Sequence, residues 1–209
     1  MRILLIGASG MIGSRVLAEA VSRGHRVVAV ARHAGKIAAG PNVEVVAADA
    51  TNVQALVPLV QQADVVVSST SPRGGTGDQT AEALAVCTAA TSAIGASGKR
   101  YLVVGGAGSL NLPDGSPLLD KLPPEYKGEA TAMRAVRDEL KASSLDWTFF
   151  SPAVMIMPGE RTGSYRLGTT TLISNQQGES RISAEDYAHA LVSELEDPRY
   201  RRSQMTIGY

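Results

Sequence analysis

The sequence is poor in cysteine and in aromatic residues. Among its 209 residues there are one cysteine, one tryptophan and two phenylalanines. Because Cys87 stands alone, an internal disulfide is excluded, and no metal-ligand spacing surrounds it, so no metal site is predicted. The few aromatic rings imply a core built mainly from aliphatic and alanine side chains, with Cys87 as a buried, inert thiol.

An excess of one charge and a long apolar run are also missing. Lys and Arg total 20, Asp and Glu total 20, and both signs are scattered. This balance argues against nucleic acid or an anionic membrane as the main partner. The apolar runs are strand-sized, and residues 1–6 are too short for a secretory signal. We therefore expect a cytoplasmic monomer or homodimer whose partner is a small-molecule acceptor.

Strand-length apolar runs alternate with helical patterns throughout the chain. Such runs suit parallel strands that are covered on both faces. The predicted fold is α/β, a Rossmann-type doubly wound and mostly parallel sheet with helices on both faces, in a single domain over 1–209. Irregular stretches at about 107–124 and 153–182 would form a small substrate-side region. Strands are expected at 3–6, 26–31, 43–48, 64–69, 100–106 and 146–151, with an edge strand at 204–207.

Helices are expected between these strands. The spacing of apolar residues predicts them from Met11, from Thr51 or Asn52 through Leu59, over 78–97 and over 125–141. The last helix, to about Glu196, opens with the capping pattern Ser183-Ala184-Glu185-Asp186. In a sheet of this kind, ligands lie beyond the carboxyl ends of the strands, so the loops that follow the strands are the expected site walls.

Three glycines follow the first strand at GxxGxxG spacing. Gly7 would permit a tight turn, Gly10 would let phosphates approach the backbone, and Gly13 would let helix and strand pack closely. An anion there would meet the free N–H groups at the start of the next helix. The turn therefore predicts a pyrophosphate site of a dinucleotide. Its expected contact residues are Gly7, Ser9, Gly10, Met11, Ile12 and Gly13.

The end of the second strand carries a base instead of an acid. A carboxylate about 20 residues beyond the glycines would bind the ribose of NAD. Arg32 stands there, with Lys36 nearby. A guanidinium can bind a 2′-phosphate through two hydrogen bonds, so the sequence favours NADP(H) over NAD(H). His33 would either join this contact or face solvent.

Other strand ends supply small or polar residues to the same edge. Asp49 would either accept a hydrogen bond from adenine, with Ala50 against the ring, or cap a helix. Substrate-wall candidates are the 71–77 loop, the segment 109–111, Met157 and Tyr165, whereas Met155 is expected to fill a core gap. Further cofactor contacts are predicted at Ser69, Thr70, Gly105, Gly106, Pro152 and Ala153, and further substrate contacts at Ser109, Met157 and Tyr165.

Several segments together resemble a known group of proteins. They are the glycine turn, residues 101–109, residues 145–153, Pro158-Gly159-Glu160-Arg161-Thr162-Gly163 and residues 181–188. Over nearly the whole chain, the sequence resembles atypical short-chain dehydrogenase/reductase-like proteins, in particular the NADH-flavin reductase group. NmrA-like proteins and, more distantly, biliverdin IXβ reductase are also similar. The resemblance implies an NAD(P)H-binding protein that reduces flavins or quinones.

One departure from the main dehydrogenase branch affects the expected chemistry. That branch uses a Tyr-x-x-x-Lys pair, whereas here Ala130 stands four residues after Tyr126, and Lys127 lies about 100° around a helix from it. No catalytic residue is assigned. The expected activity is NADPH-dependent hydride transfer to a flavin, quinone or similar acceptor, which needs mainly two oriented rings. There are two alternatives. One is a non-catalytic NADP(H) sensor of NmrA-like type, and the other is an enzyme that acts on a sugar nucleotide as an epimerase or dehydratase.

Overall fold

The computed structural model describes residues 1–72 and 77–209. Within them, eight strands form one sheet in the order β3-β2-β1-β4-β5-β6-β10-β8, and every neighbouring pair is parallel except β10 with β8. β7 (Met155–Met157) pairs with β9 (Arg181–Ser183) in a separate small sheet. The large sheet contains β1 (Arg2–Ile6), β2 (Arg26–Ala31), β3 (Val43–Ala47), β4 (Val65–Ser68), β5 (Arg100–Val104), β6 (Trp147–Ser151), β8 (Arg166–Gly168) and β10 (Ser203–Gly208).

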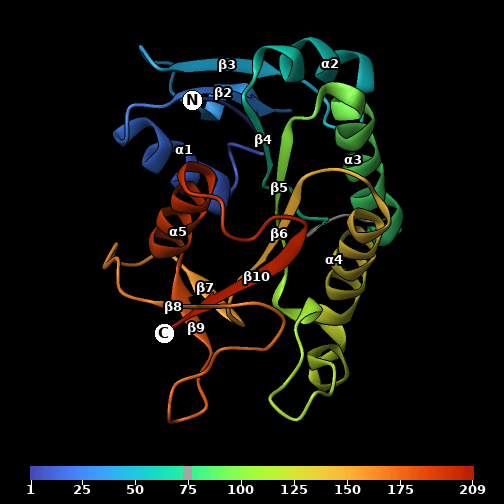
Figure 1. Cartoon of the computed structure of the whole chain (residues 1–209), viewed down its shortest axis with the longest axis vertical. Helices are drawn as coiled ribbons and strands as arrows, with labels where there is room; N and C mark the ends of the chain where they lie inside the picture. The colour runs from blue at the N-terminus through green and yellow to red at the C-terminus, as the bar shows by residue number, and fades with distance from the viewer. Residues whose placement is uncertain (73–76) are drawn as a thin grey trace.

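Helices cover both faces of this sheet (Figure 1). Along β1, Ile3 and Leu5 belong to the core layer under α1 and α5, whereas Leu4 and Ile6 belong to the layer under α2, α3 and α4. This alternation follows from the two-residue period of a strand. The predicted doubly wound fold is therefore confirmed. The helices are α1 (Met11–Ser22), α2 (Val53–Gln62), α3 (Gln79–Ile94), α4 (Pro124–Ala142) and α5 (Ala184–Glu196).

Side-chain caps define where three of the helices begin. Asn52 accepts a hydrogen bond from the N–H of Ala55 at the start of α2, and Asp78 accepts one from the N–H of Thr80 at the start of α3. Ser183 accepts one from the N–H of Asp186, which confirms the capping pattern predicted for α5. Such caps satisfy N–H groups that have no partner inside a helix. Short 3₁₀ helices lie at η1 (Ala34–Lys36), η2 (Gly95–Ser97), η3 (Ala107–Ser109) and η4 (Leu118–Lys121).

The last strand departs from the prediction. Residues 204–207 were expected at an edge of the sheet, but β10 lies between β6 and β8 and is buried from Gln204 to Gly208. The reason is that β8 pairs antiparallel with β10, with Ile207 opposite Leu167, and so becomes the edge. The three-residue β8 lay in a stretch whose sequence pattern was mixed, so the sequence did not reveal this extra strand.

The substrate-side stretches lie beyond the carboxyl ends of the parallel strands. In Figure 1 the loop from β5 to α4 and the segments around β7 and β9 occupy the lower half of the view, the side on which β5 and β6 end. The loop holds η3 and η4, so it is less irregular than the sequence suggested. A membrane-crossing helix would need a longer apolar stretch than any helix in the described parts of the chain possesses.

Candidate functional site

The glycine turn joins β1 to α1, and two of its glycines are required by packing. Gly7 has a φ of +84°, and a Cβ there would lie 2.4 Å from the carbonyl oxygen of Ser69. A Cβ on Gly13 would lie 2.2 Å from the carbonyl oxygen of Gly7. A Cβ on Gly10 would come no closer than 3.4 Å to the atoms around it. Gly10 is therefore not needed for packing, and the space beside it is open.

The start of α1 suits an anion. Gly10 is the N-cap and, within the described residues, no side chain caps the helix. The first-turn N–H groups and the positive end of the helix dipole therefore face the open space beside Gly10. This combination of a close backbone approach and unpaired donors fits a pyrophosphate group.

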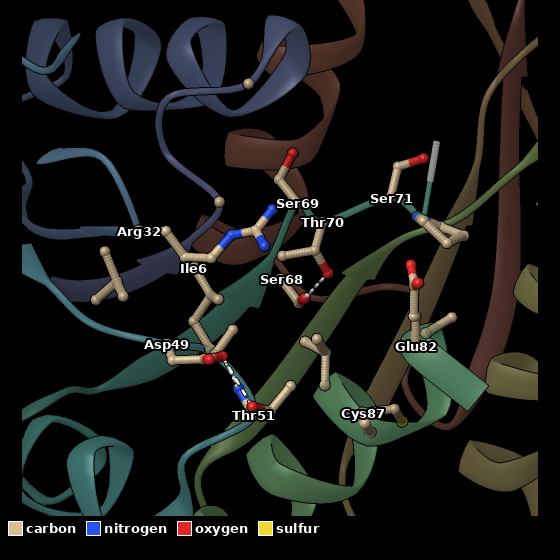
Figure 2. Close-up of a pocket in the computed structure, with 18 of the residues that line it drawn as sticks. Ile6, Arg32, Asp49, Thr51, Ser68, Ser69, Thr70, Ser71, Glu82 and Cys87 are labelled. Atoms are coloured by element: carbon tan, nitrogen blue, oxygen red, sulfur yellow. Dashed lines mark hydrogen bonds between the residues drawn. The ribbon is translucent and has the colours of Figure 1, made fainter. Parts of the chain in front are cut away.

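A cleft of about 880 Å³ opens at the ends of β1, β2, β3 and β4. Figure 2 shows Arg32 and Asp49 on one side of it, Ser71 and Glu82 on the other, and the segment 68–70 between them. This volume lies in the range of ligand sites in proteins. Of the cofactor residues predicted from the sequence, the cleft is lined by Gly7, Ser9, Gly10, Arg32, His33, Asp49, Ala50, Ser69 and Thr70.

The two charged residues on the β2–β3 side differ in how they are held. Arg32 is exposed, and the described residues give its guanidinium no hydrogen-bond partner. Asp49 accepts the N–H and the hydroxyl of Thr51 at 2.9 and 2.8 Å, and these bonds lower the pKa of its carboxyl group. Since Asn52 caps α2, the alternative that Asp49 caps that helix is wrong. Both bonds use Oδ1 of Asp49.

A second, smaller cleft of about 280 Å³ continues past the glycine turn toward β5 and α4. The predicted residues Met11, Ile12 and Gly105 line it, as do Glu129 and Met133 of α4. Ser71 donates a hydrogen bond to Glu129 at 2.7 Å, which links the chain after β4 to α4. The sequence interpretation missed Glu129 and Met133, although their four-residue spacing on the predicted helix 125–141 places them on one face.

Three predicted cofactor residues, Gly106, Pro152 and Ala153, are not among the residues that line the two clefts. Gly106 faces the side chain of Met133, since a Cβ on Gly106 would lie 3.6 Å from it. Pro152 and Ala153 are buried at the end of β6. Their side chains line neither cleft, so any contact with a ligand would fall to the backbone.

Two side chains of the predicted substrate wall form hydrogen bonds within the protein. Ser109 is buried, and its hydroxyl bonds the carbonyl oxygen of Gly106 and the hydroxyl of Ser151. It therefore serves packing beneath the loop. The hydroxyl of Tyr165 lies 2.7 Å from Nδ1 of His189 on α5, and Tyr165 lines neither cleft.

Met155 and Met157 of β7 are both exposed, and part of the predicted 71–77 loop lines the large cleft. Met155 was expected to fill a gap in the core, and this prediction is wrong, because 57% of the residue is exposed. Met157 is exposed to the same extent, 57%. Ser71 and Pro72 line the large cleft, while residues 73–76 of the predicted loop lie outside the described residues. In the described chain, no group of three or more metal-binding side chains comes together.

The doubly wound sheet, the glycine turn and the cleft beside it define a Rossmann-type dinucleotide-binding protein. A family model described as NAD(P)H-binding matches residues 7–198. The chain belongs to this NAD(P)H-binding family.

Two curated relatives extend the comparison. The uncharacterized protein YwnB of Bacillus subtilis is 36% identical, over 99% of this chain and 98% of its own. A 3-diazoavenalumate denitrifying reductase of a Streptomyces species is 32% identical, over 82% of this chain and 61% of its own. The match therefore spans less than two thirds of that reductase.

Three solved structures are similar along the whole chain. A "putative exported protein" of Burkholderia pseudomallei is 42% identical with a TM-score of 0.88, covering 100% of both chains. A "putative epimerase" of Bacteroides thetaiotaomicron is 38% identical with a TM-score of 0.89, covering 100% of this chain and 96% of the other. A "putative NADH-flavin reductase" of Streptococcus pneumoniae is 31% identical with a TM-score of 0.85, covering 100% and 99%. The chain is thus oxidoreductase-like as well as NAD(P)H-binding.

Proposed function

We propose that this protein is an NADPH-dependent oxidoreductase that transfers hydride to a flat, conjugated acceptor such as a flavin or a quinone. The observation that carries this proposal is the pair of clefts that meet at Gly10. The large cleft has the position and the lining for the adenosine and pyrophosphate part of a dinucleotide. The small cleft then lies where the nicotinamide and an acceptor would meet.

The preference for NADPH rests on Arg32. Its exposed guanidinium lies at the end of β2, the place where NAD-binding proteins of this fold carry an acid. A 2′-phosphate there would gain a charge-assisted bidentate contact. Asp49 lies in the same cleft, but Oδ1 already holds Thr51, so Oδ2 is left for the adenine amino group.

The chemistry proposed for the small cleft requires positioning more than proton transfer by a side chain. A bound dihydronicotinamide would supply the hydride. The residues of the chain would hold two rings in contact, with Met11 and Ile12 on one wall and Met133 on the other. A tyrosine–lysine pair is not available here, because Ala130 occupies the position four residues after Tyr126. Ala130 also packs closely on Gly108, since a Cβ added to Gly108 would lie 2.4 Å from the Cβ of Ala130. Solvent would therefore protonate the reduced acceptor.

The relatives support this proposal without defining the acceptor. The similar pneumococcal protein is described as an NADH-flavin reductase and the Streptomyces relative as a reductase, which favours reduction. The proposal differs from the pneumococcal description in the cofactor, on the strength of Arg32. In this proposal, flavin is a substrate that binds transiently and is not a resident cofactor. The proposed location of the protein is the cytoplasm.

The test is an acceptor screen on one purified sample. NADPH and NADH binding is first measured by fluorescence titration, and NADPH consumption is then followed at 340 nm with FMN, riboflavin and menadione. Turnover above the rate without protein supports the proposal. Tight NADPH binding without turnover of any acceptor would overturn it and favour a redox-sensing binding protein instead.

A further inference from the structure

Five exposed apolar side chains follow the carboxyl ends of strands of the large sheet. Besides Met1 and Leu167, the exposed large hydrophobic residues of the described chain are Met11, Tyr126, Val154, Met155 and Met157. Met11 follows β1, Tyr126 follows β5, and the other three follow β6. Parallel strands end at one edge of a sheet, so all five stand on the carboxyl-end side, where ligands bind in this fold. An exposed apolar side chain at this edge can therefore contact a bound ligand.

Tyr126 differs from every other aromatic residue of the protein. The chain has one tryptophan, six tyrosines and two phenylalanines, all within the described residues, and Tyr126, with 53% of it exposed, is the one ring in the exposed class. The others are buried or partly buried in the two core layers or against them. Tyr126 contributes little to the core, so packing does not explain an aromatic residue there.

The position of Tyr126 on α4 directs it toward the small cleft. Glu129 and Met133, which line that cleft, follow Tyr126 by three and seven residues. Residues at this spacing share one face of a helix. Tyr126 therefore lies on the same face of α4 as the cleft lining, about one turn before Glu129. Met11 lines the cleft from the opposite side, at the start of α1.

The surroundings of Tyr126 favour a role for the ring over a role for the hydroxyl. Four residues on, where a lysine would assist a catalytic tyrosine, Ala130 is buried against Gly108. Within the described residues, no hydrogen bond orients the Tyr126 hydroxyl. A ring without an oriented hydroxyl still has two faces on which a flat molecule can stack.

We propose that Tyr126 is a specificity-determining residue whose ring stacks on the flat conjugated acceptor at the mouth of the small cleft. This inference rests on the proposed reductase function and names the side chain that selects its substrate class. Hydride passes from the dihydronicotinamide to the acceptor, and a solvent proton completes the reduction, so the tyrosine hydroxyl takes no part.

The experiment compares Tyr126→Ala with Tyr126→Phe, and uses Leu167→Ala as a control for loss of an exposed apolar side chain that lines neither cleft. Tyr126→Ala should raise the KM for menadione and riboflavin roughly five- to tenfold, because stacking of one ring contributes on that order. Tyr126→Phe and Leu167→Ala should stay within about twofold of the wild type, by the same principle. The NADPH Kd and the Tm should be unchanged in all three.

Two results would overturn the inference. One is a Tyr126→Phe variant as impaired as Tyr126→Ala, which would assign the role to the hydroxyl. The other is an unchanged acceptor KM in Tyr126→Ala. If the wild type turns over neither probe, the proposed function fails. Quenching of riboflavin fluorescence by the protein in the presence of NADP⁺ then tests, independently of turnover, whether riboflavin stacks on Tyr126. Weaker quenching in the alanine variant alone supports stacking, whereas equal quenching in all variants, or none in the wild type, rejects it.

Discussion

At the scale of single residues, the proposed preference for NADPH depends on Arg32. Arg32→Glu replaces an attractive charge with a repulsive one beside the site proposed for the 2′-phosphate. The Kd for NADPH should rise at least about tenfold, since a charge-assisted bidentate contact is worth on the order of 1.5–3 kcal/mol. The Kd for NADH should change less than about twofold, because that cofactor has no phosphate there. Fluorescence titration of both cofactors measures this, and equal losses for the two would contradict the assignment.

Gly13 shows how closely the turn is packed. In Gly13→Ala the new methyl group would lie 2.2 Å from the carbonyl oxygen of Gly7, and backbone atoms must move to relieve the clash. Unfolding in urea should show a loss of about 1–3 kcal/mol, typical of overpacking. Gly35→Ala is the matched control, because no described atom lies within 4 Å of its added Cβ. A Gly13→Ala variant as stable as the Gly35→Ala control would show that the turn is looser than the structure indicates.

At the scale of elements, the segment after β7 is tied to α1 and α5 by acidic side chains. Glu19 of α1 accepts two hydrogen bonds from Arg161, each 2.8 Å long, and one from Arg23. Gly159 donates its N–H to Glu185, and Thr162 donates its hydroxyl to Asp186. The segment 158–163 that the family resemblance singled out is therefore an anchor between two helices, away from the cleft linings.

The ion pairs of Glu19 predict a pH dependence. The Arg161 guanidinium, with help from Arg23, lowers the pKa of Glu19 from 4.5 to about 2. A depressed folded-state pKa adds stability above the unfolded value, and this gain is lost as the pH falls toward 2. Glu19→Gln should therefore cost about 1–3 kcal/mol at pH 7 and progressively less below pH 4.5. Urea unfolding of both proteins at pH 7 and pH 3 tests this.

The control for this pH dependence is Glu44→Gln. Glu44 pairs with Arg2 at 2.8 Å, but its side chain is 53% exposed, so its loss should cost less than about 1 kcal/mol at either pH. A Glu19→Gln cost that is the same at pH 7 and pH 3 would show that the contribution of Glu19 is packing and not charge.

At the scale of the whole molecule, the sequence predicted the parts whose cause is local. The glycine turn, the apolar run of β1 and the Ser183 cap each depend on neighbours in the chain, and each appears in the structure. Ser109 and the placement of β10 depend on residues distant in sequence, namely Ser151 and β8. No local pattern reveals such partners. The contact between Tyr165 and His189 is also non-local, since the two residues lie 24 positions apart.

Because the large cleft is built from loops that follow four strands, cofactor binding should stabilise the whole fold. A ligand that binds only the folded state at 100 times its Kd contributes about 2.7 kcal/mol. For a chain of this size, that corresponds to a rise in Tm of roughly 5–10 °C. NADPH should produce this shift, and NADH at the same concentration a smaller one, because Arg32 would gain nothing from it. Differential scanning fluorimetry measures both.

Gly10→Val separates this stabilisation from any nonspecific effect of the nucleotide. Its Cβ position has room within the protein, 3.4 Å from the nearest carbonyl oxygen, so the variant should fold, with a Tm lowered only by the poorer helix cap. The added side chain would fill the space proposed for the pyrophosphate, and the NADPH-induced shift should therefore disappear. A shift as large as that of the wild type would mean that NADPH stabilises the protein from a site other than the glycine turn.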